Sequence, residues 1–396
     1  MRCDEKAAAM GLIDNQGAVG IVATMDTKSA EADFVAEIIM DCGRRVVFLD
    51  TGTSGAREQN PAELLESNAA AVKKCVDEQA ASGEITAVLG IAGGKGSGVF
   101  AHVASDLPYG FPKLLVSSAR PALLGELAAK SDIILYPTIV DFFGINSFTS
   151  RVLGNAARAI ANLHYEPTQG GRERKIVAIT AFGVTTPAVN RCVELLKQSD
   201  IDSIVFPANG TGGKKMEALI QAGEFDGVID LTTTELADEL LGGTASAGPG
   251  RLTSAGRKGI PQFIAPGAVD MVNFGARQTV PKSFEHRNLY SHTPYTTLMR
   301  TTREENEQIG RLAGERLASA SGPTIVAWPA RGVSDYDRDG GVFFDTNADE
   351  GWLKGLRDVL PETVPIIELD AHINDPDFSE TAVNWLLQQL REEKHQ

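Results

Sequence analysis

Short apolar segments alternate with longer amphipathic segments along most of this chain, and the alternation occurs in both halves. A short apolar run bounded by polar turns is typical of a strand that is buried on both faces of a sheet. Parallel strands need long crossover connections, which helices supply. The sequence therefore predicts an α/β protein with doubly wound, mostly parallel sheets.

The predicted elements fall into two sets. In the first half we expect strands at 19–23, 46–50, 86–91, 113–116 and 132–136, and helices at 29–40, 61–82, 98–105 and 146–163. In the second half we expect strands at 176–180, 203–206, 227–231, 262–265, 288–291, 324–328 and 364–369, and helices at 187–198, 214–222, 303–319 and 376–393. The polar stretch Glu166–Arg174 predicts a linker between them. We therefore expect two Rossmann-like domains, 1–168 and 169–396, with a cleft between them.

The charge balance argues against two classes of partner. The chain has 52 acidic and 37 basic residues, a net charge of −15, which repels nucleic acid and anionic lipid. No apolar run approaches the ~18–20 residues of a membrane helix, and the first residues make a poor signal peptide. The four cysteines are scattered without metal-ligand spacing, as in reduced cytosolic proteins. We expect a cytoplasmic protein that binds neither nucleic acid nor membrane.

A glycine-rich segment, Gly93-Gly94-Lys95-Gly96-Ser97-Gly98, follows the strand at 86–91. Ligands of open α/β sheets bind at the carboxyl ends of the strands, and glycines with positive φ can point backbone amides toward an anion. The segment fits neither the P-loop, because position 89 is leucine, nor GxGxxG, because Val99 replaces the third glycine. It predicts an anion-binding loop of no standard type, with a plain tight turn as the alternative.

The segment after the first strand offers a second set of candidates. Lys28 is a candidate phosphate partner and Asp26 could hold a hydrated cation. The alternative is that Asp26 or Thr27 caps the following helix.

Two segments of the second half are candidates for a further ligand. Gly210, Thr211, Gly212 and Gly213 occupy what we take to be the place equivalent to the first glycine-rich segment, and so predict a second anion loop. Thr232, Thr233, Thr234 and Glu235 follow the strand at 227–231. A capping box explains Thr232 and Glu235 but leaves the other two threonines without a role.

Asp270 and Asn273 are polar residues among apolar neighbours. Such groups are costly to bury unless they are hydrogen-bonded or bind a ligand, and both alternatives stay open. His292 could be a general acid or base, although a lone loop histidine is more often solvated or structurally bonded. Arg300 and Arg331 are candidate carboxylate or phosphate clamps, with interdomain ion pairing as the stronger alternative. The histidines and cysteines form no metal-ligand set.

Eight segments in one order resemble a known family. They are MDTK (25–28), TIVDFFGIN (138–146), FGVTTPAV (182–189), NGTGGKKMEALI (209–220), DLTTTELADELLGG (230–243), SAGPGRLTSAGRKGIPQFIAPGAVDMVNFG (246–275), TTLMRTTREEN (296–306) and RGVSDYD (331–337). Together they resemble the large bacterial family that is similar to the ATP-binding N-terminal domain of the tomato mosaic virus resistance protein. The resemblance covers nearly the whole chain and is densest in the second half. It implies a two-domain α/β protein that binds ATP with Mg²⁺ and forms dimers.

This chain departs from the family pattern in its first half. Relatives carry a GGSGGT-like loop where it has the glycine-rich segment, and a stretch with ASG where it has Ser117-Ser118-Ala119-Arg120-Pro121-Ala122. Lys95 and Arg120 would add positive charge near bound phosphates. Loss of the glycine and hydroxyls after Ala119 would instead weaken ATP binding, and both readings stay open.

Our leading hypothesis combines the residues with the resemblance. Phosphates would bind at Gly93, Gly94, Lys95, Gly96, Ser97, Ser117 and Ser118, with Asp26, Thr27 and Lys28 beside them. A small anionic metabolite would bind at Gly210–Gly213, Thr232–Thr234 and Asn273. Glu235 and Asp270 are the candidate catalytic residues for ATP-dependent phosphoryl transfer or carboxylate activation. The alternatives are a non-catalytic sensor or protein-binding module, and a nucleotide-independent sugar-acid isomerase or hydrolase.

Overall fold

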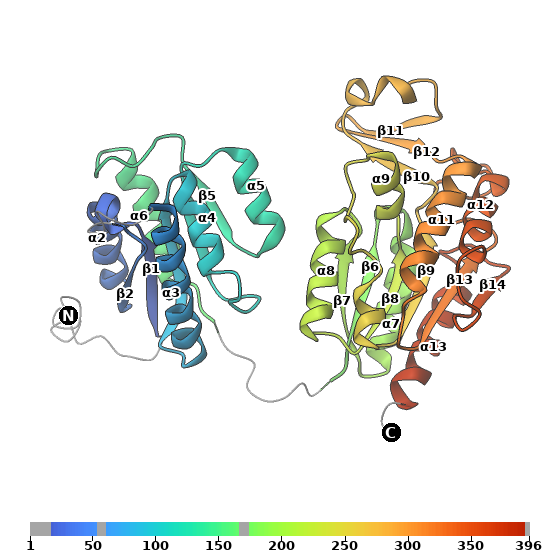
Figure 1. The fold of residues 1–396 in the computed structure, drawn as a ribbon, viewed down its shortest axis with the longest axis horizontal. Coiled ribbons are helices and arrows are strands. Elements are labelled where there is room, and N and C mark those ends of the chain that lie inside the picture. The colour runs from blue at the N-terminus through green and yellow to red at the C-terminus, as the bar shows by residue number, and fades with distance from the viewer. Residues whose placement is uncertain (1–16, 54–60, 166–173, 393–396) are drawn as a thin grey trace. The chain divides into compact units, whose positions relative to one another are not determined.

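The computed structural model describes residues 17–53, 61–165 and 174–392 (Figure 1). The chain divides into two compact units, Met1–Gln169 and Gly170–Gln396. The predicted boundary, and all of the predicted linker except Arg174, lie outside the described residues. None of the described helices combines the length and hydrophobicity that crossing a bilayer requires.

The described part of the N-terminal unit is a five-stranded parallel sheet in the order β2-β1-β3-β4-β5. The strands are β1 (Ala18–Ala23), β2 (Val46–Asp50), β3 (Ile85–Ala92), β4 (Lys113–Ser117) and β5 (Ile134–Pro137). The helices are α2 (Met25–Asp41), α3 (Pro61–Ala81), α4 (Gly94–Val103), α5 (Pro121–Lys130) and α6 (Thr149–Ala161).

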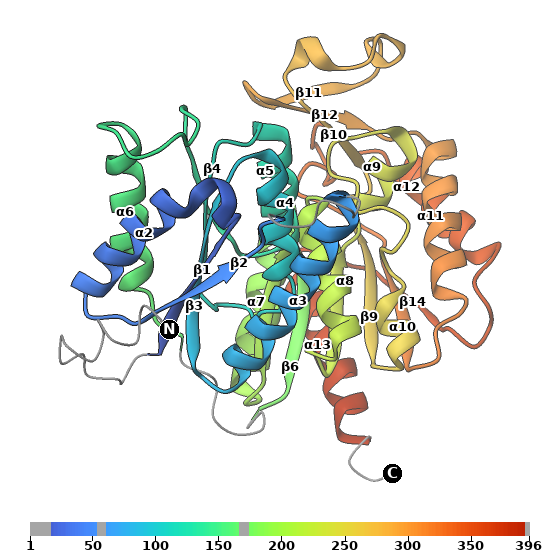
Figure 2. The same ribbon diagram turned by 60° about the vertical axis from the view of Figure 1, so that its left-hand side comes forward.

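Helices cover both faces of this sheet. Figure 2 shows α2 and α6 on one side and α3, α4 and α5 on the other. Successive side chains of a strand point to opposite faces. Val19 and Ile21 accordingly join the core under α2 and α6, whereas Val22 joins the core under α3 and α4. This two-sided burial explains why β1 and β3 are apolar almost throughout their length.

The strand order creates a topological switch point between β1 and β3. The chain leaves β1 toward β2 on one side and then crosses to β3 on the other side, so the two connections diverge. Open α/β sheets bind ligands in the crevice at the carboxyl ends of such a strand pair.

The described part of the C-terminal unit has a six-stranded parallel sheet in the order β14-β13-β9-β8-β6-β7. Its strands are β6 (Ile176–Ala181), β7 (Asp202–Pro207), β8 (Gly227–Thr232), β9 (Gln262–Gly267), β13 (Thr324–Pro329) and β14 (Ile366–Leu369). Its helices are α7 (Thr186–Gln198), α8 (Thr211–Ala222), α9 (Glu235–Leu241), α10 (Ser254–Lys258), α11 (Arg303–Leu317), α12 (Thr346–Arg357) and α13 (Pro376–Glu392). Here the switch point lies between β6 and β8.

A small antiparallel sheet is inserted between β9 and β13. It has the order β10-β12-β11, with strands β10 (Met271–Phe274), β11 (Leu289–Thr293) and β12 (Thr296–Arg300). Of these three strands the sequence predicted only β11, as a strand at 288–291, and it did not indicate the antiparallel pairing.

The predicted fold class is confirmed: two units, each with a parallel sheet covered by helices. The sequence did not predict the helices α5 and α12, and it placed some helix starts too late. We expected helices from residues 98 and 214, but α4 and α8 begin at Gly94 and Thr211. α2 begins at Met25 but has non-helical φ and ψ at Lys28, directly before the predicted start at residue 29. Small and polar residues that resembled loop therefore form the first helical turn, where backbone amides need no partner within the helix.

Candidate functional site

Two helix N-termini lie at the switch point of the N-terminal unit. α2 follows β1 with Thr24 as its N-cap, and α4 follows β3 with Gly93 as its N-cap. Because β1 and β3 are parallel neighbours, both helix starts lie side by side at the carboxyl ends of these strands. A helix N-terminus carries a partial positive charge and exposed amide donors, which favour anions. The sequence candidates at the two strand ends are therefore brought to one crevice.

The start of α4 carries backbone amides without partners. The amides of Gly94, Lys95 and Gly96 have no acceptor among the described residues, and the Gly93 N-cap offers no side-chain acceptor. A Cβ atom on Gly94 would meet nothing within 4 Å. Space and donors are thus both present.

The geometry of this segment differs from our prediction. The φ of Gly93 is −89°, and no glycine from 93 to 98 has a positive φ. The segment is the first turn of a helix rather than an irregular loop with inward-pointing amides. Donors are still presented, but by the helix end.

Serines join this turn to the end of β4. Ser97 Oγ lies 2.7 Å from Ser117 Oγ and donates to Gly93 O at 2.8 Å, and both side chains are buried. Ser118 is half-buried and donates to Asp141 Oδ1 at 2.8 Å, which lowers the pKa of Asp141. Ser97 and Ser117 support the turn, whereas Ser118 lies at its surface.

The charged candidates after β1 hold neighbouring loops. Lys28 Nζ donates to Phe142 O at 2.5 Å, and Asp26 Oδ2 accepts from the Thr53 amide at 3.1 Å. Thr27 Oγ1 donates to Thr24 O at 3.3 Å. Neither Asp26 nor Thr27 is the N-cap that our alternative predicted, because Thr24 holds that position.

The glycine-rich turn of the C-terminal unit is filled by the chain itself. Glu235 Oε1 accepts from the amides of Gly210 at 2.6 Å and Gly213 at 3.2 Å. Asn209 Oδ1 accepts from the Gly212 amide at 3.1 Å. Of the amides that we predicted would bind a metabolite, those of Gly210 and Gly213 therefore bind a carboxylate of the protein and that of Gly212 binds a side-chain amide oxygen, while the Thr211 amide has no acceptor among the described residues.

These glycines allow close packing. A Cβ atom on Gly213 would lie 2.2 Å from Glu235 Oε2, and one on Gly212 would lie 1.9 Å from Pro207 O. Thr211 is exposed at the helix start. This turn also differs in position from the glycine-rich turn at the start of α4. It follows the edge strand β7, whereas the start of α4 follows a strand at the switch point.

Arg251 fixes Glu235 from the other side. Its fully buried guanidinium donates from Nε to Glu235 Oε2 at 2.5 Å and from Nη2 to Asp230 Oδ1 at 2.7 Å. Burial lowers the pKa of Arg251, but Asp230 and Glu235 outweigh that effect and hold it well above its usual value. With every neighbour accounted for, Glu235 has the contacts of a structural ion pair, and nothing here supports a role as catalytic base.

The three threonines close the second switch point. Thr232 Oγ1 lies 2.8 Å from Thr185 Oγ1, which follows β6. Thr233 and Thr234 donate to the carbonyls of Ala265 and Met271, at 3.0 and 3.4 Å. All three are fully buried. The capping box that we considered is absent, since the N-cap of α9 is Thr234 and makes no side-chain cap bond.

Of the two alternatives for Asn273, hydrogen bonding and ligand binding, the structure shows the first. Its Nδ2 donates to Asp238 Oδ2 at 2.9 Å, and Asp238 Oδ1 accepts from the Ala245 amide at 2.9 Å. Burial raises the pKa of Asp238 to about 7. This pair joins β10 to α9 and the loop after it.

Asp270 belongs to a buried acidic cluster around Arg300. Its Oδ2 accepts from Ser334 Oγ at 2.8 Å, and its Oδ1 has no hydrogen-bond partner among the described residues. Arg300 Nη2 donates to Asp349 Oδ1 at 2.6 Å and lies 3.7 Å from Asp337 Oδ1. Burial and then Asp337 raise the pKa of Asp270 to about 7, and burial raises that of Asp349 to about 9. One cationic side chain, that of Arg300, thus lies near three buried carboxyl groups.

The remaining candidates have ordinary partners. Arg331 forms an exposed ion pair with Asp370 at 2.7 Å, within the C-terminal unit rather than between the two units as the interdomain alternative predicted. The Nδ1 atom of His292 lies 2.7 Å from the hydroxyl of Tyr336, at the surface. No group of three or more potential metal ligands occurs in the part of the chain that the structure describes.

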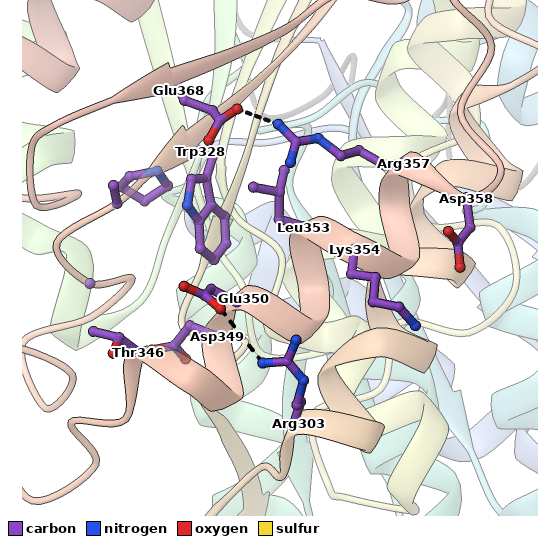
Figure 3. Close-up of a pocket in the computed structure, with 13 residues that line it drawn as sticks. Arg303, Trp328, Thr346, Asp349, Glu350, Leu353, Lys354, Arg357, Asp358 and Glu368 are labelled. Carbon is purple, nitrogen blue, oxygen red and sulfur yellow. Dashed lines mark hydrogen bonds and ion pairs between the residues drawn. The ribbon is translucent and has the colours of Figure 1, made fainter.

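A cavity that the sequence did not indicate lies at the carboxyl ends of β13 and β14. It has a volume of about 520 Å³, and Figure 3 shows Trp328 on one side and α12 on the other. Its rim charges are paired, Arg303 with Glu350 at 3.6 Å and Arg357 with Glu368. The lining residues are Arg303, Trp328, Pro329, Ala330, Gly332, Thr346, Asp349, Glu350, Leu353, Lys354, Arg357, Asp358 and Glu368. These paired charges indicate no ligand of a particular sign.

His372 was also missed, because it is isolated in the sequence. Its Nε2 lies 2.9 Å from Ser334 O and its Nδ1 accepts from the Asn374 amide at 3.1 Å. Nε2 is thus the donor, and burial lowers the pKa of this neutral ring. It holds the loop after β14 against the loop after β13.

Comparison with known proteins gives consistent matches over most of the chain. A 36% identical UPF0261 protein of Clostridium tetani matches over 390 residues, 91% of this chain and 95% of that protein. The UPF0261 protein RA0729 of Rhizobium meliloti is 38% identical over 92% of this chain and 96% of its own length. The ToMV resistance protein Tm-1(GCR237) of Solanum lycopersicum is 35% identical over 81% of this chain, which is 43% of the tomato protein.

Solved structures add little. The match to the structure of MurG from Acinetobacter baumannii covers 63% of this chain and 79% of the MurG chain at 13% identity. Its TM-score of 0.21 is too low to carry an argument.

Family profiles, in contrast, match both units. Residues 57–169 match the N-terminal domain, and residues 174–390 the C-terminal domain, of the uncharacterised protein family UPF0261. This chain therefore belongs to the UPF0261 family.

Proposed function

We propose that this protein binds ATP through its N-terminal unit, with the phosphates at the start of α4. One observation carries the proposal: the first amides of α4 have no acceptor among the described residues, at the switch point where open α/β sheets bind ligands. The resemblance to an ATP-binding domain supplies the identity of the anion.

The side chains around α4 fit a polyphosphate. Lys95 is exposed in the first helical turn and can reach a bound phosphate, and Ser118 Oγ lies 3.7 Å from the position of a Cβ on Gly93. Asp26 is exposed, and its Oδ1 has no partner among the described residues. Mg²⁺ prefers phosphate oxygens, water and one or two carboxylates, so Asp26 fits a hydrated magnesium ion beside the phosphates.

The proposal is limited to nucleotide binding. Glu235 is enclosed in an ion pair and Asp270 in a buried cluster, so neither contact set supports the phosphoryl-transfer chemistry that we considered. The small anionic metabolite and the homodimer stay predictions.

Thermal unfolding with MgATP, MgADP or buffer tests the proposal. A ligand at about 100 times its Kd adds roughly 2.7 kcal/mol of stability, which is readily seen as a rise in Tm. Gly94→Asp should abolish the rise, because it places a negative charge in the open space before the free amides. Gly98→Asp is the matched control, since that glycine also borders open space but lies one turn farther along α4. The absence of any shift at millimolar MgATP would refute the proposal.

A further inference from the structure

Exposed apolar side chains are concentrated in the loop between β5 and α6. Ile139, Phe143 and Phe148 are 105%, 86% and 67% exposed. Residues 138–146 of this loop are the TIVDFFGIN segment, to which the proposal above gives no role. Exposed apolar patches on soluble proteins commonly mark a binding surface.

Three hydrogen bonds hold this loop beside the crevice of the N-terminal unit. Asp141 Oδ1 accepts from Ser118 at the end of β4, at 2.8 Å. Phe142 O accepts from Lys28 of α2 at 2.5 Å, and the Gly144 amide donates to Glu31 Oε1 at 2.9 Å. Two of these partners, Ser118 and Lys28, are candidate phosphate neighbours. Figures 1 and 2 both show the loop passing along the carboxyl-end edge of the sheet toward α6.

Phe142 and Phe143 have opposite environments. Phe142 is fully buried in the core under α2 and α6, which anchors the loop, whereas Phe143 points outward from that anchored backbone. The ammonium group of Lys28 lies 5.4 Å from the centroid of the Phe143 ring. A cation near an aromatic face positions the ring, and its 86% exposure leaves ring surface for another planar group.

We infer that Phe143 and its loop bind the purine base of the nucleotide whose phosphates bind at α4. The inference rests on the proposed function and adds the base-binding part of the same site. Aromatic side chains stack on nucleic-acid bases with about 1–3 kcal/mol per base. The loop offers such a side chain, beside further apolar surface, and is tethered to the residues around the phosphates.

Calorimetric titration with two probes, MgATP and magnesium tripolyphosphate, separates the base from the phosphates. Phe143→Ser should weaken MgATP binding about tenfold or more and leave tripolyphosphate binding unchanged, because only ATP has a base to stack. Tyr109→Ser is the matched control: Tyr109 is 77% exposed and lies before β4, at the opposite edge of the sheet. It should change neither affinity.

The other outcomes overturn the inference in distinguishable ways. If the unaltered protein binds neither probe, the proposed function fails and the base site with it. If it binds both probes, and Phe143→Ser leaves ATP binding unchanged or weakens both probes equally, only the base site fails. Sedimentation of the same variants checks for another occupant, since loss of a dimer in Phe143→Ser without loss of ATP affinity would assign the loop to a second copy of the chain.

Discussion

The helices α4 and α8 begin alike and differ in what meets them. Each has a glycine N-cap and follows a parallel strand. The first three amides of α4 have no acceptor among the described residues, whereas the amides of Gly210 and Gly213 at the start of α8 bind Glu235. The glycine pattern is therefore the same for a helix start that is open and for one that the protein fills itself. The two helix starts differ because the Glu235 carboxylate, which follows β8, binds amides at the start of α8.

The position of the strand matters as well. α4 follows β3, which flanks a switch point, while α8 follows the edge strand β7. The counterpart of β3 in the C-terminal unit is β8, and the residues after β8 are the buried threonines. One switch point is thus lined by donors, and the other is closed by side-chain hydrogen bonds.

Removing Arg251 should damage the closed site most. Arg251→Met leaves Glu235 and Asp230 buried without their cation, and breaking a buried pair costs about 3–5 kcal/mol. Urea unfolding followed by tryptophan fluorescence measures this loss, because all three tryptophans lie in the C-terminal unit. Arg331→Met, at an exposed pair, should cost about 1 kcal/mol or less. Equal losses in the two variants would show that Glu235 does not depend on Arg251.

Alanine at the two glycine turns tests the comparison directly. Gly213→Ala forces a Cβ against Glu235 and should cost about 1–3 kcal/mol. Gly94→Ala meets open space and should be neutral or stabilising by up to about 1 kcal/mol, because alanine favours the helix. Thermal unfolding followed by circular dichroism gives both values, and a loss in Gly94→Ala as large as in Gly213→Ala would mean that α4 is not open.

The two units should respond oppositely to pH. Asp238, Asp270 and Asp349 of the C-terminal unit have raised pKa values, about 7, 7 and 9, so the folded state holds protons that the unfolded chain loses above pH 4. These groups make the free energy of unfolding fall as pH rises from about 4 toward 7–9. Asp132 and Asp141 of the N-terminal unit have lowered pKa values, so their contribution is lost as pH falls below about 4.

Asp270→Asn isolates one of these groups. It should flatten the pH dependence of the C-terminal unit by at most about 1.4 kcal/mol per pH unit, the value for one proton. Urea unfolding at pH 5, 6, 7 and 8, followed by tryptophan fluorescence, measures the slope. Identical slopes in the variant and the unaltered protein would mean that Asp270 is ionised throughout.

The smallest effect is expected at the support of the open site. Ser97→Ala removes the hydrogen bonds to Gly93 O and Ser117 Oγ and should cost about 1 kcal/mol. Ser105→Ala is the control, because that serine is exposed and its hydroxyl bonds, within the described ranges, only to its neighbour Asp106. Thermal unfolding of both variants gives the difference in their loss of stability. A difference near zero would mean that the Ser97–Ser117 pair does not stabilise the first turn of α4.

The sequence predicted the strands well because buried parallel strands are apolar along their whole length, as β1 and β3 are. It placed Asp26–Lys28 and Gly93–Ser97 after the two strands that turn out to flank a switch point. It could not predict the role of Glu235, since Arg251 comes from a loop 16 positions later and only the tertiary fold brings them together. The cavity beside Trp328 was missed for the same reason, because its lining comes from α11, α12, β13, β14 and the loop after β13.

The filled start of α8 has a consequence for how the C-terminal unit responds to its surroundings. A carboxylate that is part of the chain is present at a fixed and high effective concentration, which does not change with the supply of metabolites. A phosphate or carboxylate from solution would have to displace Glu235 and leave Arg251 without one of its partners. We therefore expect α8 to be indifferent to the concentration of small anions in solution, while α4 stays responsive to them.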